Sequence, residues 1–595
     1  MKVQIYAEDW MLSMGMVGLK RLFKDEVEIT EFGVLFDFKL LEKLPEIYFN
    51  YLIKEFNIAE RDYVSMRNNL KFAAGSKERF HQGLQQIKRA MVEQHKKVAR
   101  YFIDQPPEIQ LKMLIEDVKK IKLPEQIAVL EECIEEYYKI MKTNTGINEK
   151  LTINYFKTVI MTPFYGQPSF LNVSKNSLTK EEQMDLFFKD YVKPVILEAE
   201  FQDHLDIEKE PECIKNFLQK NISHKPFSDI LKSIKKMKSL GEIKGYIATL
   251  PKCTLIDGQL ATSNFEEMVF SPLGVTGCAY NFNWDLESRQ PMPLSVLAKL
   301  MLFLVPAGLT FYNRKDGYGV QGEYRTYAGF VMSDQPFTEI YRMNDSFKTK
   351  KKNNNPFDEV VYGLLQDTQQ RVKYVVNQLF FLEMFSEYQS KKTLLDYYHM
   401  PPYIAEYFYK YGDKLKAIRP RELREAFVRF ALKGIEPQEI VFRCLQVSIR
   451  QNSSGIGGYI AARELNRIKA LKKGVKDMPK EDKRVYVVFK QGQELRDNLI
   501  KTGENRAASS EVYTAGGGKK INAIAYRLLN AAKAGSKKSF MDTLFRIHMA
   551  VGKEVSSIFL NVLHEKDLTF EVVSSAFIAG LLSEEYRDQE GVVNE

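Results

Sequence analysis

The sequence contains few cysteines, and no two of them are close together in the chain. Its 595 residues include five, with no CxxC pair among them: Cys133, Cys213, Cys253, Cys278 and Cys444. Such wide spacing argues against a disulfide scaffold and is typical of a protein in a reducing compartment. We therefore expect a cytoplasmic location.

The sequence also lacks a long apolar run. Its most apolar segment, Leu300–Phe311, contains Pro306 and is shorter than the roughly 18 residues that a membrane span needs. The opening KVQIYA has a single lysine and is followed by Glu8 and Asp9, which is unlike a secretory signal. We expect no membrane partner.

Groups of residues that carry out chemistry are equally scarce. The seven histidines are scattered without an HExxH or HxH pair, and there is no GxSxG motif. The run TAGGGKK resembles a Walker A loop only in part, because Tyr513 replaces its first glycine and Lys520 its Ser or Thr. We predict no enzyme, no catalytic residues and no cofactor. The alternative is a metal-dependent nuclease or other nucleic-acid-processing enzyme with ligands from distant positions.

Positive charge is concentrated in one part of the chain. The net charge is +9, but the segment Arg463–Lys538, here called the basic block, has 19 Lys and Arg against 8 Asp and Glu. The following segment, Asp542–Glu595, has 4 basic residues against 10 acidic ones. A basic segment of this density typically binds a polyanion, and the alternative is a solvated lysine-rich surface.

Lysines and arginines that neutralise phosphates bind nucleic acid without reading its sequence. Few aromatic residues interrupt the basic block, which favours contact with the backbone over base stacking. The side chains predicted to contact the backbone are Lys469, Lys472, Lys473, Lys483, Arg484, Lys519, Lys520, Arg527, Lys537 and Lys538.

Base edges are read by Asn, Gln, Ser or Lys side chains on rigid loops. Two loops could supply them, and for each the alternative is an ordinary polar surface. The first, YGQPSFLNVSKNS, offers Gln167, Ser169, Asn172, Lys175 and Asn176. The second, KTKKKNNNP, offers Lys351, Lys352 and Asn353.

Hydrophobic periodicity predicts an α+β fold, with a mixed α/β N-terminal region before a mainly helical C-terminal bundle. Strand, helix and strand are expected over Lys2–Tyr6, Trp10–Phe23 and Thr30–Phe38. The segment Thr152–Asn172 is β-prone, and Ile207–Lys244 is lysine-rich and helical. The predicted domains are a mixed region at 1–357, a helical connecting region at 358–474 and a helical bundle at 478–595.

Three segments share one family resemblance. They are Ile5–Phe23 (IYAEDWMLSMGMVGLKRLF), Phe270–Arg314, which contains FSPLGVTGCAYNFNWDL and LSVLAKLMLFLVPAGLTFYNR, and Lys519–Arg546 (KKINAIAYRLLNAAKAGSKKSFMDTLFR). Together they resemble the large subunit of Cascade, of the CXXC–CXXC family, in type I-B CRISPR antiviral systems. The bundle at 478–595 resembles the small subunit of such complexes.

The resemblance implies a non-catalytic role in a ribonucleoprotein complex. The partners it implies are crRNA, target double-stranded DNA, the backbone, handle-binding and small subunits of Cascade, and a helicase-nuclease. The N-terminal region would contact the crRNA handle and recognise the motif beside the target (the PAM), and the subunit would support R-loop formation. Guide pairing would read the remaining sequence. A stand-alone DNA-binding regulator is a further alternative.

Two finer expectations follow from the resemblance. Family members have two CxxC pairs that look like a zinc site, but here the pairs fall at Cys253–Ile256 and Leu294–Leu297, so only Cys253 remains. One thiolate cannot hold a tetrahedral zinc ion, and we predict none. In addition, the small subunit can be made separately from an internal start, which here would be Met478.

Overall fold

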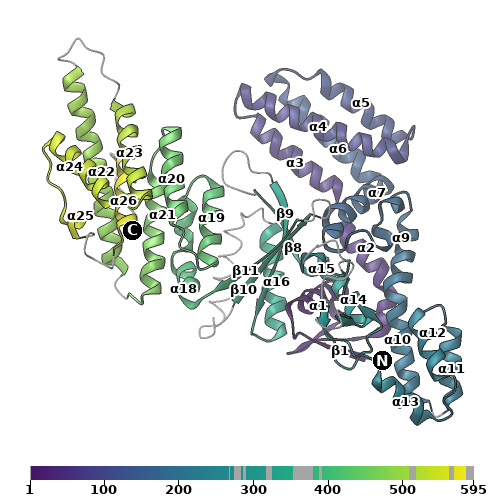
Figure 1. Cartoon of the computed structure of the whole chain (residues 1–595). Helices are drawn as coiled ribbons and strands as arrows, with labels where there is room; N and C mark the ends of the chain where they lie inside the picture. Colours follow the sequence, from purple (N-terminus) through teal and green to yellow (C-terminus); the bar gives the residue numbers. More distant parts are fainter. Residues whose placement is uncertain are drawn as a thin grey trace. The chain divides into compact units, whose positions relative to one another are not determined.

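A computed structural model describes residues 2–208, 210–266, 268–273, 283–285, 290–315, 324–352, 379–387, 392–475, 478–507, 517–561 and 568–584 (Figure 1). The chain divides into two compact units. Unit 1 comprises Met1–Leu309, Pro336–Tyr341 and Met384–Leu395, and unit 2 comprises Thr310–Gln335, Arg342–Glu383 and Asp396–Glu595. Small sheets occur with helices, and the C-terminal part is a helical bundle, so the predicted α+β class is confirmed.

The chain begins with the predicted strand, helix and strand. β1 (Lys2–Tyr6) pairs antiparallel with β3 (Gly33–Asp37), which also pairs with the short β2 (Glu28–Ile29). Between them, α1 (Trp10–Phe23) starts at Asp9, whose Oδ1 accepts hydrogen bonds from two backbone N–H groups at 2.6 and 2.9 Å. A carboxylate at this position satisfies unpaired donors and complements the helix dipole.

The buried face of α1 packs closely against α14 (Val296–Phe303) and α15 (Val305–Gly308). A Cβ on Gly15 would lie 2.2 Å from a backbone oxygen of α14, and one on Gly308 would lie 1.9 Å from a backbone oxygen of α1. These helices therefore touch backbone to backbone. Two of the three segments that carry the family resemblance meet at this contact.

A group of long helices in unit 1 has a hydrophobic core of its own. Its helices are α3 (Ile58–Ala73), α4 (Lys77–Phe102), α5 (Pro106–Lys120), α6 (Ile127–Thr143) and α7 (Thr145–Tyr155). In Figure 1, α3 to α6 lie side by side. The buried carboxylate of Asp62 ties them together, because it accepts hydrogen bonds from Arg61 (2.7 Å), Gln94 (2.7 Å) and Tyr137 (3.1 Å).

The β-prone segment Thr152–Asn172 is helical as far as Tyr165, contrary to the prediction, and a 3₁₀ turn follows at Ser169–Leu171. α7 continues through a π-helical turn at Phe156–Met161 into α8 (Thr162–Tyr165). Its aromatic side chains enter a buried cluster of rings, in which the ring centroids of Phe156 and Phe49 lie 6.0 Å apart. Burial in this cluster overrides the intrinsic β preference of the residues.

Unit 1 continues through α9 (Lys180–Phe187) and a second π-helical turn (Phe188–Val192), and α2 (Leu44–Glu55) contacts both. α10 (Lys193–Ile207), α11 (Pro211–Lys220), α12 (Lys225–Ile234) and α13 (Leu240–Thr249) share a separate hydrophobic cluster. The predicted helical segment Ile207–Lys244 is thus confirmed. Strands of two or three residues follow, with β4 (Ser263–Asn264) paired to β7 (Pro293–Leu294). β5 (Asn283–Asp285) pairs with β6 (Gln290–Pro291).

A four-stranded sheet precedes the helical bundle. Its order is β11 (Lys392–Met400), β10 (Leu379–Glu387), β9 (Tyr324–Ser333) and β8 (Thr310–Lys315). α16 (Phe337–Lys352) is joined to it by the buried Asn344, which exchanges hydrogen bonds of 2.9 and 2.7 Å with the backbone of Val331. The predicted helical region at 358–474 therefore contains two strands, which is a correction. The apolar run LFFLEMF is too short for its period to distinguish a buried strand from a helix.

The helical bundle of unit 2 surrounds the apolar helix α26 (Phe570–Leu581), all but one of whose residues are buried. The other helices are α18 (Pro402–Tyr411), α19 (Arg421–Leu432), α20 (Gln438–Gln451), α21 (Ile456–Lys472), α22 (Met478–Ala507), α23 (Gly517–Lys533), α24 (Lys537–Val551) and α25 (Ser557–Asn561). α20, α21, α22 and α23 all contact α26. The bundle thus extends across the predicted boundary at 474–478.

Candidate nucleic-acid interface

Part of the basic block is engaged in ion pairs inside the bundle. Glu464 is fully buried and accepts hydrogen bonds from Arg463 (2.9 Å), Arg467 (2.9 Å) and the hydroxyl of Tyr407 (3.1 Å). Arg467 also binds both carboxylate oxygens of Asp482 at 3.0 and 3.1 Å. Burial disfavours the charge of Arg467, but these carboxylates more than compensate and raise its pKa. These cations are neutralised within the bundle and are not available to a phosphate backbone.

The predicted backbone contacts on α21 and α22 lie in different surroundings. Lys469 is 13% exposed and pairs with Glu436 at 3.1 Å. Lys472, Lys473 and Lys483 are exposed, whereas Arg484 is half-buried. Only part of this predicted set therefore presents its charge to solvent.

The helical hairpin of α23 and α24 presents the largest group of exposed cations in the basic block. Five of these cations have no acidic partner within 4 Å among the described residues. They are Lys520, Arg527, Lys533, Lys537 and Lys538. Lys519 also lies in α23, but its side chain is outside the described residues. Five predicted residues and Lys533 thus share one hairpin, and the side chains of all but Lys519 are described as exposed. An uncompensated group of cations suits a phosphate backbone.

Two aromatic side chains are exposed on the same hairpin. Tyr526 is 52% exposed and precedes Arg527, and Phe545 is 39% exposed on α24. They were not among the predicted contact residues, because aromatic residues are sparse across the block as a whole. The signal was local: Tyr526 falls on the polar side of an amphipathic helix, three and four residues away from Ala523 and Asn530, which are also exposed.

The first predicted reading loop is held at both ends. Phe170 is buried, and its ring packs against those of Phe49, Phe187 and Phe303, with centroid distances of 5.1, 5.9 and 6.0 Å. At the other end, the backbone oxygen of Leu178 accepts hydrogen bonds from Gln183 and Lys150. Loops anchored in this way hold their outward side chains in fixed positions.

Within this loop, Asn172 and Lys175 are exposed, while Gln167, Ser169 and Asn176 are half-buried. The Ser169 hydroxyl is buried, and its residue has a left-handed φ of 52°. The Asn172 side-chain oxygen accepts a hydrogen bond from the Ser174 N–H at 2.9 Å. Its amide nitrogen thus remains as the donor for a base edge.

The second predicted loop is only partly described. Lys351 and Lys352 form the end of α16, so they are helical, and nothing is described of their side chains. Asn353 lies outside the described residues.

The two segments that correspond to the zinc-binding pairs of the resembled family are adjacent. The Thr254 N–H donates to the Pro293 oxygen at 3.1 Å, beside the paired strands β4 and β7. Buried at the pair positions are Cys253, Ile256, Leu294 and Leu297, of which only the cysteine has a metal-binding atom. This donor set does not fit zinc.

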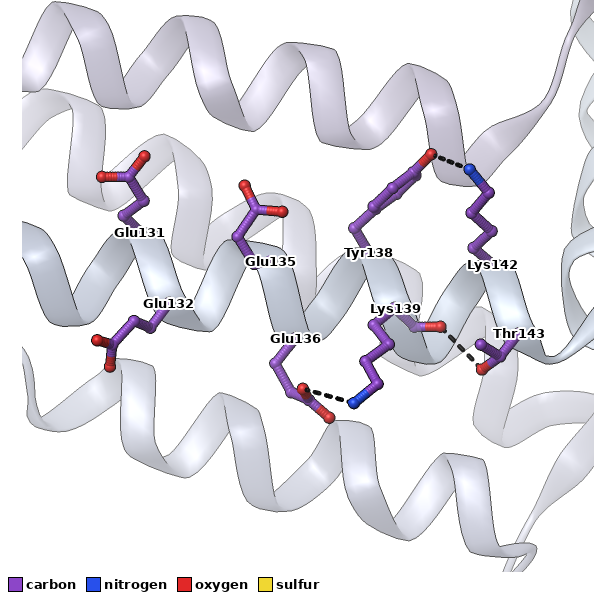
Figure 2. Close-up of a pocket in the computed structure, with 8 residues that line it drawn as sticks. All are labelled: Glu131, Glu132, Glu135, Glu136, Tyr138, Lys139, Lys142 and Thr143. Atoms are coloured by element: carbon purple, nitrogen blue, oxygen red, sulfur yellow. Dashed lines mark hydrogen bonds and ion pairs between the residues drawn. The ribbon is translucent and has the colours of Figure 1, made fainter.

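A hollow along α6 has the wrong charge for a phosphate backbone. It has a volume of about 630 Å³ and runs along α6, lined by Glu131, Glu132, Glu135, Glu136, Tyr138, Lys139, Lys142 and Thr143. In Figure 2, Glu131 and Glu135 lie on one side of the helix and Glu132 and Glu136 on the other. Four carboxylates against two lysines repel a polyanion.

Within the parts of the chain that the structure describes, no three His, Cys, Asp or Glu side chains form a group that could hold a metal ion. No described helix has both the length and the apolar character needed to cross a bilayer. Neither a protein-family model nor a curated protein matches the sequence significantly.

Proposed function

We propose that the protein is a non-catalytic nucleic-acid-binding subunit of a ribonucleoprotein complex, like the large subunit of a type I-B Cascade. In this role it contacts crRNA and recognises the motif beside the DNA target. It also supports R-loop formation and recruits a helicase-nuclease.

The observation that carries the proposal is the cationic hairpin of α23 and α24. Lys520, Arg527 and Lys533 are exposed on α23, and none is neutralised by a described carboxylate. Phosphate contacts from such side chains give affinity and a steep salt dependence, and they carry no sequence information.

Recognition of the motif belongs to the first predicted reading loop, Tyr165–Ser177. Asn172 and Lys175 point to solvent from a backbone that buried rings and two hydrogen bonds hold in place. An amide donor and a lysine on a fixed backbone can contact base edges in the major groove.

The family resemblance gives independent support. Its first two segments pack together through Gly15 and Gly308, although they are almost 300 residues apart in the chain. The positions of the family's two CxxC pairs also lie side by side, joined by the Thr254–Pro293 hydrogen bond. Buried apolar side chains, Ile256, Leu294 and Leu297, stand at three of the four positions where that family has cysteines.

Two measurements test the proposal. The protein, purified from its native host, should co-elute with a small RNA and several other subunits. In addition, Lys520→Gln/Arg527→Gln/Lys533→Gln should weaken DNA binding about equally for all sequences and lower the salt slope by about 2–3.

The loop supplies the matched comparison. Asn172→Ala should change the preferred motif and leave the salt slope almost unchanged, because it removes no charge. A purified protein that carries no RNA, or a hairpin variant that changes sequence preference, would contradict the proposal. Metal-dependent DNA cleavage by the isolated protein would favour an enzyme instead.

A further inference from the structure

A second group of uncompensated cations lies in unit 1, far from the basic block in sequence. The segment Pro211–Lys252, here called the lysine module, contains nine lysines, no arginine and three acidic residues. Its local net charge is +6 over 42 residues, and that of the basic block is +11 over 76 residues, so the two have nearly the same net charge per residue. The module comprises α11, α12, α13 and the three residues after α13.

All three acidic side chains of the module are already engaged within it. Glu212 pairs with Lys215 at 2.9 Å, and Asp229 pairs with Lys232 at 3.1 Å. Glu242 caps α13, because its Oε2 accepts hydrogen bonds from two backbone N–H groups at 3.0 and 3.2 Å. These contacts lower the pKa of Glu242 and keep it ionised.

Seven lysines of the module consequently have no acidic partner within 4 Å among the described residues. All are exposed: Lys220, Lys225, Lys235, Lys236, Lys238, Lys244 and Lys252. Three of them, Lys235, Lys236 and Lys238, lie together in the turn between α12 and α13. Three like charges in one short turn create a local positive potential that attracts an anion.

The acidic residues that precede the module in sequence belong to α10 and the turn after it. Two of these are used in pairs, Glu198 with His224 at 2.8 Å and Glu208 with His204 at 3.2 Å. The two signs of charge are therefore separated along the segment from α10 to Lys252. Carboxylates predominate on its first helix and lysines on the next three.

We propose that the lysine module is a separate docking surface for the phosphate backbone of nucleic acid, centred on Lys235, Lys236 and Lys238. Lysine ammonium groups contact phosphates as point charges, whereas paired recognition of bases favours arginine, which the module lacks. Of its aromatic residues, Phe227 is buried and Phe217 and Tyr246 are half-buried in the module core, so they form no stacking platform. The contact is sequence-independent.

The test uses the full-length chain with Lys235→Gln/Lys236→Gln/Lys238→Gln. Binding is measured by fluorescence anisotropy to two labelled duplexes of about 30 base pairs with unrelated sequences. We expect affinity for both to fall at least tenfold at about 0.1 M salt, and the salt slope to fall by about 2–3. Thermal melting checks that the fold is retained.

The matched control is Lys119→Gln/Lys120→Gln/Lys139→Gln, which removes the same charge from exposed lysines of α5 and α6 that have acidic partners. It should leave both duplex affinities within about twofold, because surface ion pairs contribute little. The inference is overturned if the two triple variants behave alike.

A second arm measures binding to vesicles that contain phosphatidylserine. Loss of vesicle binding with unchanged DNA affinity would make the module a membrane contact and overturn the inference. The hairpin variant Lys520→Gln/Arg527→Gln/Lys533→Gln is measured in parallel. If only the hairpin variant loses DNA affinity, the role of the lysine module is overturned and the proposed function stands. If only the lysine-module variant loses DNA affinity, the module's role stands and the hairpin no longer supports the proposed function.

Discussion

Lys157 shows what tertiary structure does to a single charged residue. It lies in the π-helical turn after α7, is 1% exposed, and donates one hydrogen bond, to Gln183 at 3.0 Å. Burial, together with the charge of Lys150, lowers its pKa from 10.5 to about 7. A buried ammonium group with a single acceptor is costly, so the neutral amine is favoured.

We predict that Lys157→Met stabilises the protein at pH 6. Between pH 7 and 10.5 the unfolded chain binds a proton that the folded chain lacks, so the stability of the wild type falls as pH decreases through this window. Below about pH 7 the full cost is present. The gain from the substitution should therefore be larger at pH 6 than at pH 9, by about 2–3 kcal/mol. Denaturant melts at the two pH values measure it.

The control for this prediction is Lys71→Met, at an exposed position of α3. Its stability should stay within about 0.5 kcal/mol of the wild type at both pH values. A destabilisation of Lys157→Met that is equal at pH 6 and pH 9 would mean that the folded protein holds this lysine charged.

At the candidate interface, the sequence predicted where basic residues are concentrated, but not which of them are exposed and which are paired inside the bundle. The exposed cations of α23 follow from composition and helical period. The internal pairing of Arg467 with Asp482 could not be predicted, since two residues 15 positions apart meet only when α21 and α22 pack. The lysine module overlaps the segment Ile207–Lys244, which was predicted to be helical and lysine-rich. Its uncompensated charge appears only once each acidic partner is assigned.

At the scale of elements, close helix contacts depend on a few glycines. Gly15 and Gly308 allow α1 to touch α14 and α15, and Gly492 and Gly580 do the same for α22 and α26, where a Cβ would lie 2.4 and 2.1 Å from backbone oxygens. Rigid backbone cannot move aside as a flexible side chain can.

We predict that Gly308→Ala lowers the stability of the protein by about 3 kcal/mol or more, because its Cβ would overlap a backbone oxygen of α1. Thermal melting and soluble yield measure the effect. The matched substitution is Gly245→Ala in α13, where no atom lies within 4 Å of the new Cβ. There we expect a gain of about 0.5–1 kcal/mol from helix propensity. Equal melting of the two variants would show that α1 and α15 separate readily.

The elements that the sequence predicted correctly are those whose periodicity is strong and local. Lys2–Tyr6 alternates in a sheet with one buried face, and Trp10–Phe23 has a capping Asp9 and a helical stripe. The segments that were predicted wrongly, Thr152–Asn172 and Leu379–Met400, are aromatic-rich and apolar. Their conformation depends on which neighbours bury them, and a single-chain pattern carries no information about neighbours.

At the scale of the molecule, the predicted boundary at 474–478 runs through a shared core. Tyr459 on α21 packs against Phe489 on α22 at 4.3 Å, and Ser454 bonds to Ser583 at 3.2 Å. A Cβ on Gly455 would lie 2.4 Å from a backbone oxygen of α26. Removal of α20 and α21 would therefore expose one side of the most apolar helix of the bundle.

We predict that a fragment of residues 402–595 melts cooperatively, whereas the fragment 478–595 does not and binds a hydrophobic dye such as ANS. The shorter fragment loses the contacts of α20 and α21 with α26, so its core is left half covered. Circular dichroism melts and dye fluorescence compare the two.

Both fragments contain the cationic hairpin. DNA binding by the longer fragment, with the salt slope of the full chain, would therefore locate the binding activity within residues 402–595. If residues 478–595 melt sharply and within a few degrees of 402–595, the bundle does divide at Met478. Otherwise, a separate product from Met478 needs a partner surface that takes the place of α20 and α21, which a subunit assembled in a larger complex would have.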